Sequence, residues 1–419
     1  MRCRGYVRLA GGACLALAWC SGNARADVLT LSMAQARERA ARVSPEVQLA
    51  AGRVRQARAS RVGAGVIMPV NPRLSVDGRS GLAPNDRGVF GLGSTLDMTF
   101  EVGGAPAARV QEAGARTLAA SSEREVTRGD ARLAAARAYV VVRLAEMRGE
   151  RAREAIELGS TVLDAAIQRS NTGAGSEIDV TSARAELAQY QSQLYAAQAE
   201  QREGEMQLRS LLAIPSGTPL RLSSPLDEFA PAPDIEHLLE HARAHYPELQ
   251  AIRTHLAMMR ASDARLSAEA FPKLGTFLGV DASPLSPVYG LIGVSIELPF
   301  AQRNQGPRAV IAAERETEGA RYAFTATRLE LVLRATRDSY EARRQELSVL
   351  TTQGLPAARR HLQLVEIGWR AGHFDIFRLT SAAQSFERIK LARIAVVARL
   401  WEQRLLLERL IGGTIDEHA

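Results

Sequence analysis

TGAGSEIDVTSARAEL, at residues 172–187, returns as AGHFDIFRLTSAAQSF at residues 371–386. Aligned without gaps, the two stretches match Gly173 with Gly372 and share a Thr-Ser-Ala triplet. Self-similarity at a fixed spacing is the sequence signature of a repeated structural unit. The spacing of about two hundred residues therefore predicts that most of this chain is built twice.

Each stretch predicts a tight turn followed by a helix. Ser176 and Asp179, three residues apart, fit a capping box, in which each side chain accepts a hydrogen bond from the other residue's backbone N–H. Asp375 can cap the equivalent helix in the second stretch. We therefore expect return helices at about 176–213 and 375–411.

The repeat extends outward from these turns in both directions. VSPEVQLA at 43–50 aligns with HYPELQAI at 245–252, and NPRL at 71–74 aligns with FPKL at 271–274. A proline-rich segment, PLDEFAPAP, lies between the two halves and predicts a linker. The expected divisions are a first repeat at 27–224, a linker at 225–233, a second repeat at 234–413 and a tail at 414–419.

The segment before each turn predicts a very long helix, and a compact globular domain of this size would not need helices of such length. Residues 107–169 contain no proline. Apolar residues recur every seven positions: Val126, Leu133, Val140 and Met147 in the first half, and Leu333, Tyr340 and Leu347 in the second. Heptad spacing indicates helices that wrap around one another. We expect rods at about 105–170 and 303–370, the second bent at Pro356, and roughly 95 Å for a helix of about 63 residues.

Short alternating segments precede each rod and predict strands. In LDMTF at 96–100, for example, apolar and polar residues alternate. One apolar and one polar face suit either a half-buried soluble sheet or the wall of a membrane barrel, and the alternation leaves both possibilities open. A single helix from about Ser32 to the 63–65 region is expected before the first strands. The expected strands are at about 72–82, 88–101, 273–282 and 288–299.

The N-terminus has the three parts of a secretory signal peptide at residues 1–26: early arginines, a short apolar run and an Ala-Arg-Ala cleavage site. Cleavage would remove all three cysteines, which leaves no disulfide and no thiolate metal site. Cys20 raises lipidation as an alternative, but Trp19 is bulkier than the residue that lipoprotein signals place there. Losing four arginines would lower the net charge from +7 to +3, so no nucleic-acid partner is expected.

Five stretches carry a resemblance to a known family. They are SPEV at 44–47, YPEL at 246–249, FEVGGAPAARV at 100–110, LPFAQRNQGPRAVIAAE at 298–314 and LPAARRHLQLVEIGWRAGHFDIFRLTSAAQ at 355–384. Together with the duplicated layout, they make residues 29–413 resemble the TolC-like outer-membrane efflux family. The glycine pair at 103–104 and the RNQG run at 303–306 are similar to its heavy-metal (cobalt–zinc–cadmium) branch.

The resemblance implies a mainly α fold with a small β part. Long helices form a periplasmic α-barrel, and four strands per protomer contribute to a shared, twelve-stranded outer-membrane β-barrel in a homotrimer. It also implies three contacts: outer-membrane lipid, a periplasmic adaptor (membrane fusion protein) and an inner-membrane RND-type pump. The chain would then be a passive exit duct that extends into the periplasm, with no catalytic residue and no cofactor.

The resemblance further implies roles for the helix turns. The adaptor- and pump-docking tip would consist of Asn171, Gly173, Ser176, Arg370, Gly372 and Asp375. Asp375 and Arg378 would form a periplasmic gate. The alternative is that these residues only cap and terminate helices.

One pattern indicates chemistry of another kind. His237–His241 fits the H-x-x-E-H motif of inverted zinc proteases, and with His245 it places three histidines on one helical face. The aligned first-half residues are Gln35, Arg39 and Val43, so the scaffold does not require a metal there. An exposed stripe without metal is the competing interpretation.

Three alternatives for the function stay open. The preferred one is an outer-membrane duct for heavy-metal cations. A second keeps the duct but changes the cargo to drugs or to proteins of type I secretion. A third is a soluble periplasmic coiled-coil scaffold without a pore.

Overall fold

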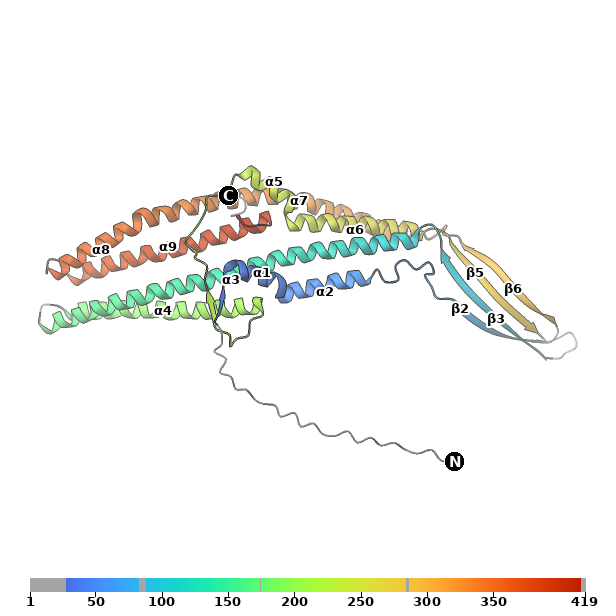
Figure 1. Ribbon diagram of the computed structural model, residues 1–419, viewed down its shortest axis with the longest axis horizontal. Helices are drawn as coiled ribbons and strands as arrows, with labels where there is room; N and C mark the ends of the chain where they lie inside the picture. Colours follow the sequence, from blue (N-terminus) through green and yellow to red (C-terminus); the bar gives the residue numbers. More distant parts are fainter. Residues whose placement is uncertain (1–27, 83–87, 174, 284–285, 416–419) are drawn as a thin grey trace, which may run out of the picture.

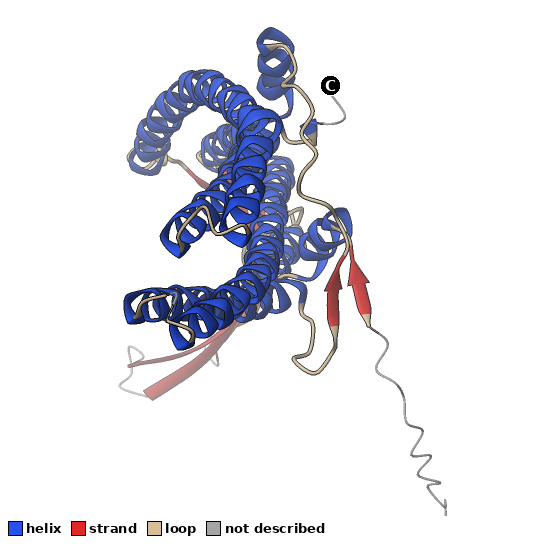
Figure 2. Cartoon of the chain, turned by 90° about the vertical axis from the view of Figure 1, so that its left-hand side faces the viewer, coloured by secondary structure: helices blue, strands red, loops and turns tan. Residues whose placement is uncertain are grey.

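The computed structural model describes residues 28–82, 88–173, 175–283 and 286–415. Long helices run side by side, with a sheet at one end and two helical turns at the other (Figure 1). Seen along the long axis, the helices lie in a curved layer (Figure 2). The expected mainly helical fold with a small strand part is confirmed. The expected signal peptide, including Cys20, lies outside the described residues.

The two halves repeat one order of elements. The first contains β1 (Leu29–Leu31), α1 (Met33–Val43), α2 (Pro45–Ala59), β2 (Arg73–Leu82), β3 (Gly88–Glu101), α3 (Ala105–Asn171) and α4 (Glu177–Leu212). The second contains β4 (Leu220–Leu222), α5 (Ile235–His245), α6 (Pro247–Glu269), β5 (Lys273–Ser283), β6 (Ser286–Glu297), α7 (Gln305–Val349), the π-helical turn η1 (Leu350–Gly354), α8 (Leu355–Arg370) and α9 (Ile376–Ile411).

The first helical segment is broken, so the expectation of one helix from Ser32 to the 63–65 region was wrong. Ser44 is extended (φ −59°, ψ 145°) and separates α1 from α2, which begins at Pro45. A proline in mid-helix lacks the N–H that the helix needs and clashes with the preceding turn. Ser44 Oγ instead accepts a hydrogen bond from Val47 N at 3.4 Å and caps α2. Tyr246 is likewise extended (φ −61°, ψ 116°) and separates α5 from α6, which begins at Pro247, but its side chain makes no capping hydrogen bond.

The two rods differ in continuity. α3 is one α-helix of 67 residues, whereas the second rod consists of α7, the π-helical turn η1 and α8. Pro356 lies in the first turn of α8, where its missing N–H disturbs the ladder, and a π-helical turn is a recognised cause of a kink. Among the described residues, no helix combines the length and apolarity needed to cross a membrane.

Two sheets are present in the described residues. The larger one has the order β2-β3-β5-β6, with every neighbouring pair antiparallel. The smaller one pairs β1 with β4 in parallel, Leu29 opposite Leu220 and Leu31 opposite Leu222. The sequence did not reveal this small sheet because three-residue strands are too short to show a period.

One core holds the halves together midway along the molecule. Tyr139 of α3 and Tyr340 of α7 are both fully buried in it. Tyr340 Oη donates to the Ala230 carbonyl at 2.7 Å, and Trp401 Nε1 donates to the Leu226 carbonyl at 2.9 Å. The segment between β4 and α5 is therefore fastened across the core by hydrogen bonds to its backbone.

Candidate functional site

The larger sheet has one apolar face, which the strand register assembles from four strands. Leu74 pairs with Leu96, Leu96 with Leu278 and Leu278 with Ile292, so the four form one row. Residues paired in this way lie on the same side of a pleated sheet. Leu74, Leu278 and Ile292 are 68%, 55% and 85% exposed. A contiguous exposed apolar face marks contact with a membrane or another protein.

The opposite face of the same sheet carries mostly polar residues and glycine, with apolar exceptions such as Phe277 and Leu291. Arg79 Nη1 of β2 lies 2.8 Å from Asp281 Oδ2 of β5. β3 lies between these two strands, so the ion pair crosses over it. At the crossing β3 carries Gly91 and Gly93, which have no side chains to obstruct the ion pair. The two faces therefore suit two different solvents, one apolar and one aqueous.

A buried ion pair fixes the junction between the sheet and α3. Glu101, only 8% exposed, ends β3, and Arg109 Nη1 lies 2.5 Å from its Oε2. Arg109 also donates to the carbonyls of Ala64 and Val66. Gly103 (φ +85°) makes the turn between them, and a Cβ at that position would lie 2.4 Å from Phe271 Cγ. These contacts of Arg109 join the end of β3 and the 64–66 segment to the start of α3.

The first helix turn contains three of the expected tip residues. Asn171 ends α3, and Gly173 takes the left-handed conformation (φ +74°) that ends a helix. Ser176 Oγ accepts a hydrogen bond from Asp179 N at 3.2 Å, and Asp179 Oδ2 accepts one from Ser176 N at 3.0 Å. The expected capping box is present, and its residues are exposed or only partly buried.

The second turn is built differently. Arg370 is ion-paired with Glu366 in the last turn of α8, and Gly372 (φ +77°) reverses the chain. Asp375 Oδ1 accepts a hydrogen bond from the backbone N of Arg378 at 2.9 Å. The Arg378 guanidinium lies 5.0 Å from the centre of the Phe374 ring. The two expected gate residues are thus joined through a helix cap.

The fold brings the two turns together at the end away from the sheet (Figure 1). A small apolar cluster links all four helices there: Val162, Ala166, Ala183, Val365, Ile376, Leu379 and Ala382. Gln384 Nε2 also donates to Glu186 Oε2 at 2.7 Å, which connects α9 to α4. The expected tip residues therefore lie on two turns, one from each half, at the same end of the molecule (Figure 1).

The histidine stripe lies on α5, away from the helix tips. His241 and His245 stack with ring centroids 4.2 Å apart and planes 19° apart. His237 lies one turn earlier, and its backbone N–H is capped by Asp234. In the described part of the chain, no group of three or more His, Cys, Asp or Glu side chains is placed to hold a metal ion.

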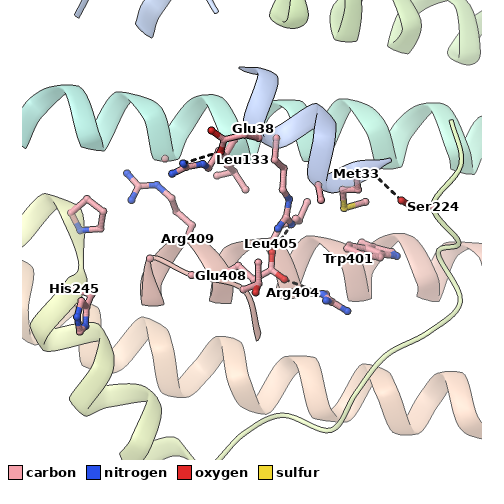
Figure 3. A pocket seen from close by; sticks show the side chains of 18 of the residues that line it. Met33, Glu38, Leu133, Ser224, His245, Trp401, Arg404, Leu405, Glu408 and Arg409 are labelled. Carbon is pink, nitrogen blue, oxygen red and sulfur yellow. Dashed lines mark hydrogen bonds and ion pairs between the residues drawn. The ribbon is translucent and has the colours of Figure 1, made fainter. Parts of the chain in front are cut away.

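A cavity of about 1360 Å³ lies between the halves beside α5 and was not expected from the sequence (Figure 3). On its α9 wall, Glu408 is ion-paired with both Arg37 and Arg404, whose Nε lies 3.0 Å from Glu408 Oε1. On the opposite wall, Arg42 and then Arg132 hold the pKa of Glu38 below its usual range. In the sequence, only the i, i+4 spacing of Arg404 and Glu408 could have indicated the ion pair on this wall.

Comparison with known proteins gives consistent results. The family model described as "Outer membrane efflux protein" matches residues 24–213 and 238–413. The cobalt-zinc-cadmium resistance protein CzcC of Cupriavidus metallidurans is 24% identical over 320 residues, 76% of each chain. Among solved structures, CusC is 15% identical with a TM-score of 0.74, covering 91% of this chain and 92% of its own. VceC of Vibrio cholerae is 18% identical with a TM-score of 0.72, covering 91% and 96%.

Proposed function

The chain belongs to the outer membrane efflux protein family, and from that premise we propose that it is the exit duct of a tripartite system that exports heavy-metal cations. In this role the chain performs no catalysis and needs no cofactor. It stands in the outer membrane and extends into the periplasm. The observation that carries the proposal is the sheet with one apolar and one polar face at the end of a curved helical layer.

The sheet supports a shared barrel. Within the described residues, β2 and β6 form the two edges of the sheet and pair on one side only. Unpaired backbone groups are very costly in a lipid bilayer, so a sheet there must close on itself or on its neighbours. Four strands are too few to close alone, and three copies supply twelve, an allowed barrel size. We therefore assign the chain to a homotrimer whose apolar face contacts outer-membrane lipid.

The helical layer supports the periplasmic section of the duct. Its curvature is that of one segment of a tube wall (Figure 2), and three such segments would enclose a channel. At its far end we place the docking surface for the periplasmic adaptor and the inner-membrane RND-type pump. Its residues are Asn171, Gly173, Ser176, Arg370, Gly372 and Asp375.

The proposed cargo comes from the relatives. The curated relative is named a cobalt-zinc-cadmium resistance protein, and the residues at 103–104 and 303–306 led to the same branch. Export of drugs or secreted proteins is the alternative cargo. In a passive duct the pump selects most of the cargo, so the test must measure tolerance in the cell.

Fractionation tests the duct itself. Full-length protein should be recovered in the outer-membrane fraction, as a trimer that resists detergent and dissociates on heating. Recovery in the soluble periplasmic fraction would support the scaffold alternative and overturn the proposal. Ile292→Asp, on the apolar face, should prevent assembly, whereas Thr95→Asp on the polar face is the matched control.

Deletion of the gene tests the cargo. Loss of the chain should lower the tolerance of its host to cobalt, zinc or cadmium ions, and the wild-type gene should restore it. Unchanged metal tolerance together with greater sensitivity to drugs would instead favour the alternative cargo.

Charge reversal tests the gate. We place Asp375 and Arg378 at the periplasmic constriction because both lie at the start of α9, where the two turns meet. Asp375→Lys should make cells permeable to bulky antibiotics, while Asp179→Lys on the first turn serves as the control. Equal permeability in both variants would contradict the gate assignment.

A further inference from the structure

His241 and His245 lie together in the last turns of α5 and have no role in the proposed duct. Their ring centroids are 4.2 Å apart with an angle of 19° between the planes. Figure 3 shows His245 at the edge of the cavity between the halves. Two imidazoles at i and i+4 on one helix are spaced to bind the same metal ion.

The hydrogen bond of His245 sets its available ligand atom. Its Nδ1 lies 3.1 Å from the His241 carbonyl oxygen. A carbonyl only accepts, so Nδ1 carries the proton and the lone pair resides on Nε2. Metal-binding histidines usually have this arrangement, because a backbone carbonyl that holds one ring nitrogen orients the other toward the metal.

The spacing and the local field both favour a cation. Two nitrogens at about 2.0–2.1 Å from a tetrahedral metal lie roughly 3.3 Å apart. The ring centroids are close enough for that separation, but the rings are nearly parallel, so the His241 ring must turn out of the stack for both free nitrogens to face one ion. Both residues lie near the C-terminal end of α5, where the helix dipole is negative. Arg409, on the same cavity, is ion-paired with Asp130 at 2.8 Å and Glu248 at 3.5 Å, which offsets its charge.

We propose that His241 and His245 form a two-histidine site for a divalent cation of the zinc, nickel and copper class, with water completing the coordination. Imidazole is a favoured ligand for these metals. Of the three histidines in the stripe, only the stacked pair His241 and His245 serves as ligands in this site, and His237 lies outside it. The proposal is independent of the duct, since α5 lies apart from both the sheet and the tips.

Calorimetry on the full-length protein in detergent tests the site. The protein should carry no polyhistidine tag, and the probes should be zinc, nickel and copper chlorides added singly. Wild type should bind one ion per chain. His241→Gln and His245→Ala should each lower the affinity roughly tenfold or more, whereas His237→Ala should leave it unchanged.

Three results would overturn the proposal. The first is an absence of stoichiometric binding by wild type for all three ions. The second is unchanged affinity in His241→Gln. The third is an equal loss in His237→Ala, which would indicate the three-histidine site. Circular dichroism of each variant checks folding, and His241→Gln retains a polar helix former if His245→Ala unfolds the end of α5.

Discussion

The two rods occupy equivalent places in the two halves, yet one is continuous and the other is interrupted. α3 runs from Ala105 to Asn171 without a break. Its counterpart contains five residues of π-helix, Leu350–Gly354, directly before Pro356. The two halves thus share the order of their elements but differ in the continuity of their rods. The interruption lies between the core and the second tip, so that tip has a place to bend that the first tip lacks.

The largest effect on stability is expected when a proline is introduced into the continuous rod and compared with removal of the proline from the interrupted rod. Ala155 is 2% exposed in the uninterrupted rod, and proline there removes a helix bond and clashes with the Arg151 carbonyl. Ala155→Pro should cost about 3 kcal/mol or more. Pro356→Ala should change stability by less than about 1 kcal/mol, because the π-helical turn before Pro356 already accommodates its ring and its missing N–H. Thermal unfolding followed by circular dichroism measures both.

A second substitution at the same position isolates the cause. Ala155→Gly removes the side chain but keeps the N–H, and it should cost about 1 kcal/mol. If Ala155→Pro were as mild as Ala155→Gly, the first rod would tolerate a kink, and the mechanical difference between the halves would disappear.

The entries into the two rods differ at their left-handed residues. Gly103 and Gly104 lead into α3, whereas Asn304 (φ +58°) caps α7. Gly103→Ala should cost about 1–3 kcal/mol, because its Cβ would collide with the Phe271 ring. Gly104→Asn should cost under about 1 kcal/mol, since the space around Gly104 is open and asparagine tolerates this conformation. Thermal unfolding measures the stability of both variants. Equal losses of stability would show that the open space around Gly104 does not make its substitution milder.

How far the sequence predicts this molecule depends on the length of each signal. The rods repeat their heptads over many turns, and apolar and polar residues alternate along the strands for ten residues or more. Both patterns are therefore long enough to be distinguished from chance. β1 and β4 have three residues each and meet only through the fold. Pro356 predicted a bend in the second rod, but not that the interruption would be the π-helical turn η1. Ser44 and Pro45 did carry a readable signal, since proline after a capping residue starts a new helix. The Arg37–Glu408 contact joins residues 371 positions apart, a distance that no local pattern bridges.

The two buried tyrosines give a smaller contrast. Tyr139 Oη donates to the Leu31 carbonyl at 3.2 Å and accepts from Ser224 N at 2.7 Å. Tyr340 Oη donates to Ala230. Tyr139→Phe leaves the Ser224 N–H without its acceptor and should cost about 1–3 kcal/mol; the Leu31 carbonyl still accepts from Ser223 N at 3.1 Å. Tyr340→Phe removes only the hydrogen bond to the Ala230 carbonyl and should cost about 0.5–1.5 kcal/mol. Chemical unfolding measures the free energy of unfolding of both variants. A larger loss of stability in Tyr340→Phe than in Tyr139→Phe would contradict this expected order.

The effects expected at the tips are confined to single helix ends, and they compare the two halves most directly. Ser176→Ala and Asp375→Ala should each cost about 0.5–2 kcal/mol, because each removes a side-chain cap. The loss should appear as faster hydrogen exchange in the first turn of α4 or α9, with the core unchanged. Asp375→Asn retains a capping oxygen but no charge. If Asp375→Asn exchanges like wild type, the capping hydrogen bond alone stabilises the second tip. If it exchanges like Asp375→Ala, the carboxylate charge stabilises that tip. The interrupted half would then rely on electrostatics, whereas the continuous half relies on a reciprocal capping box.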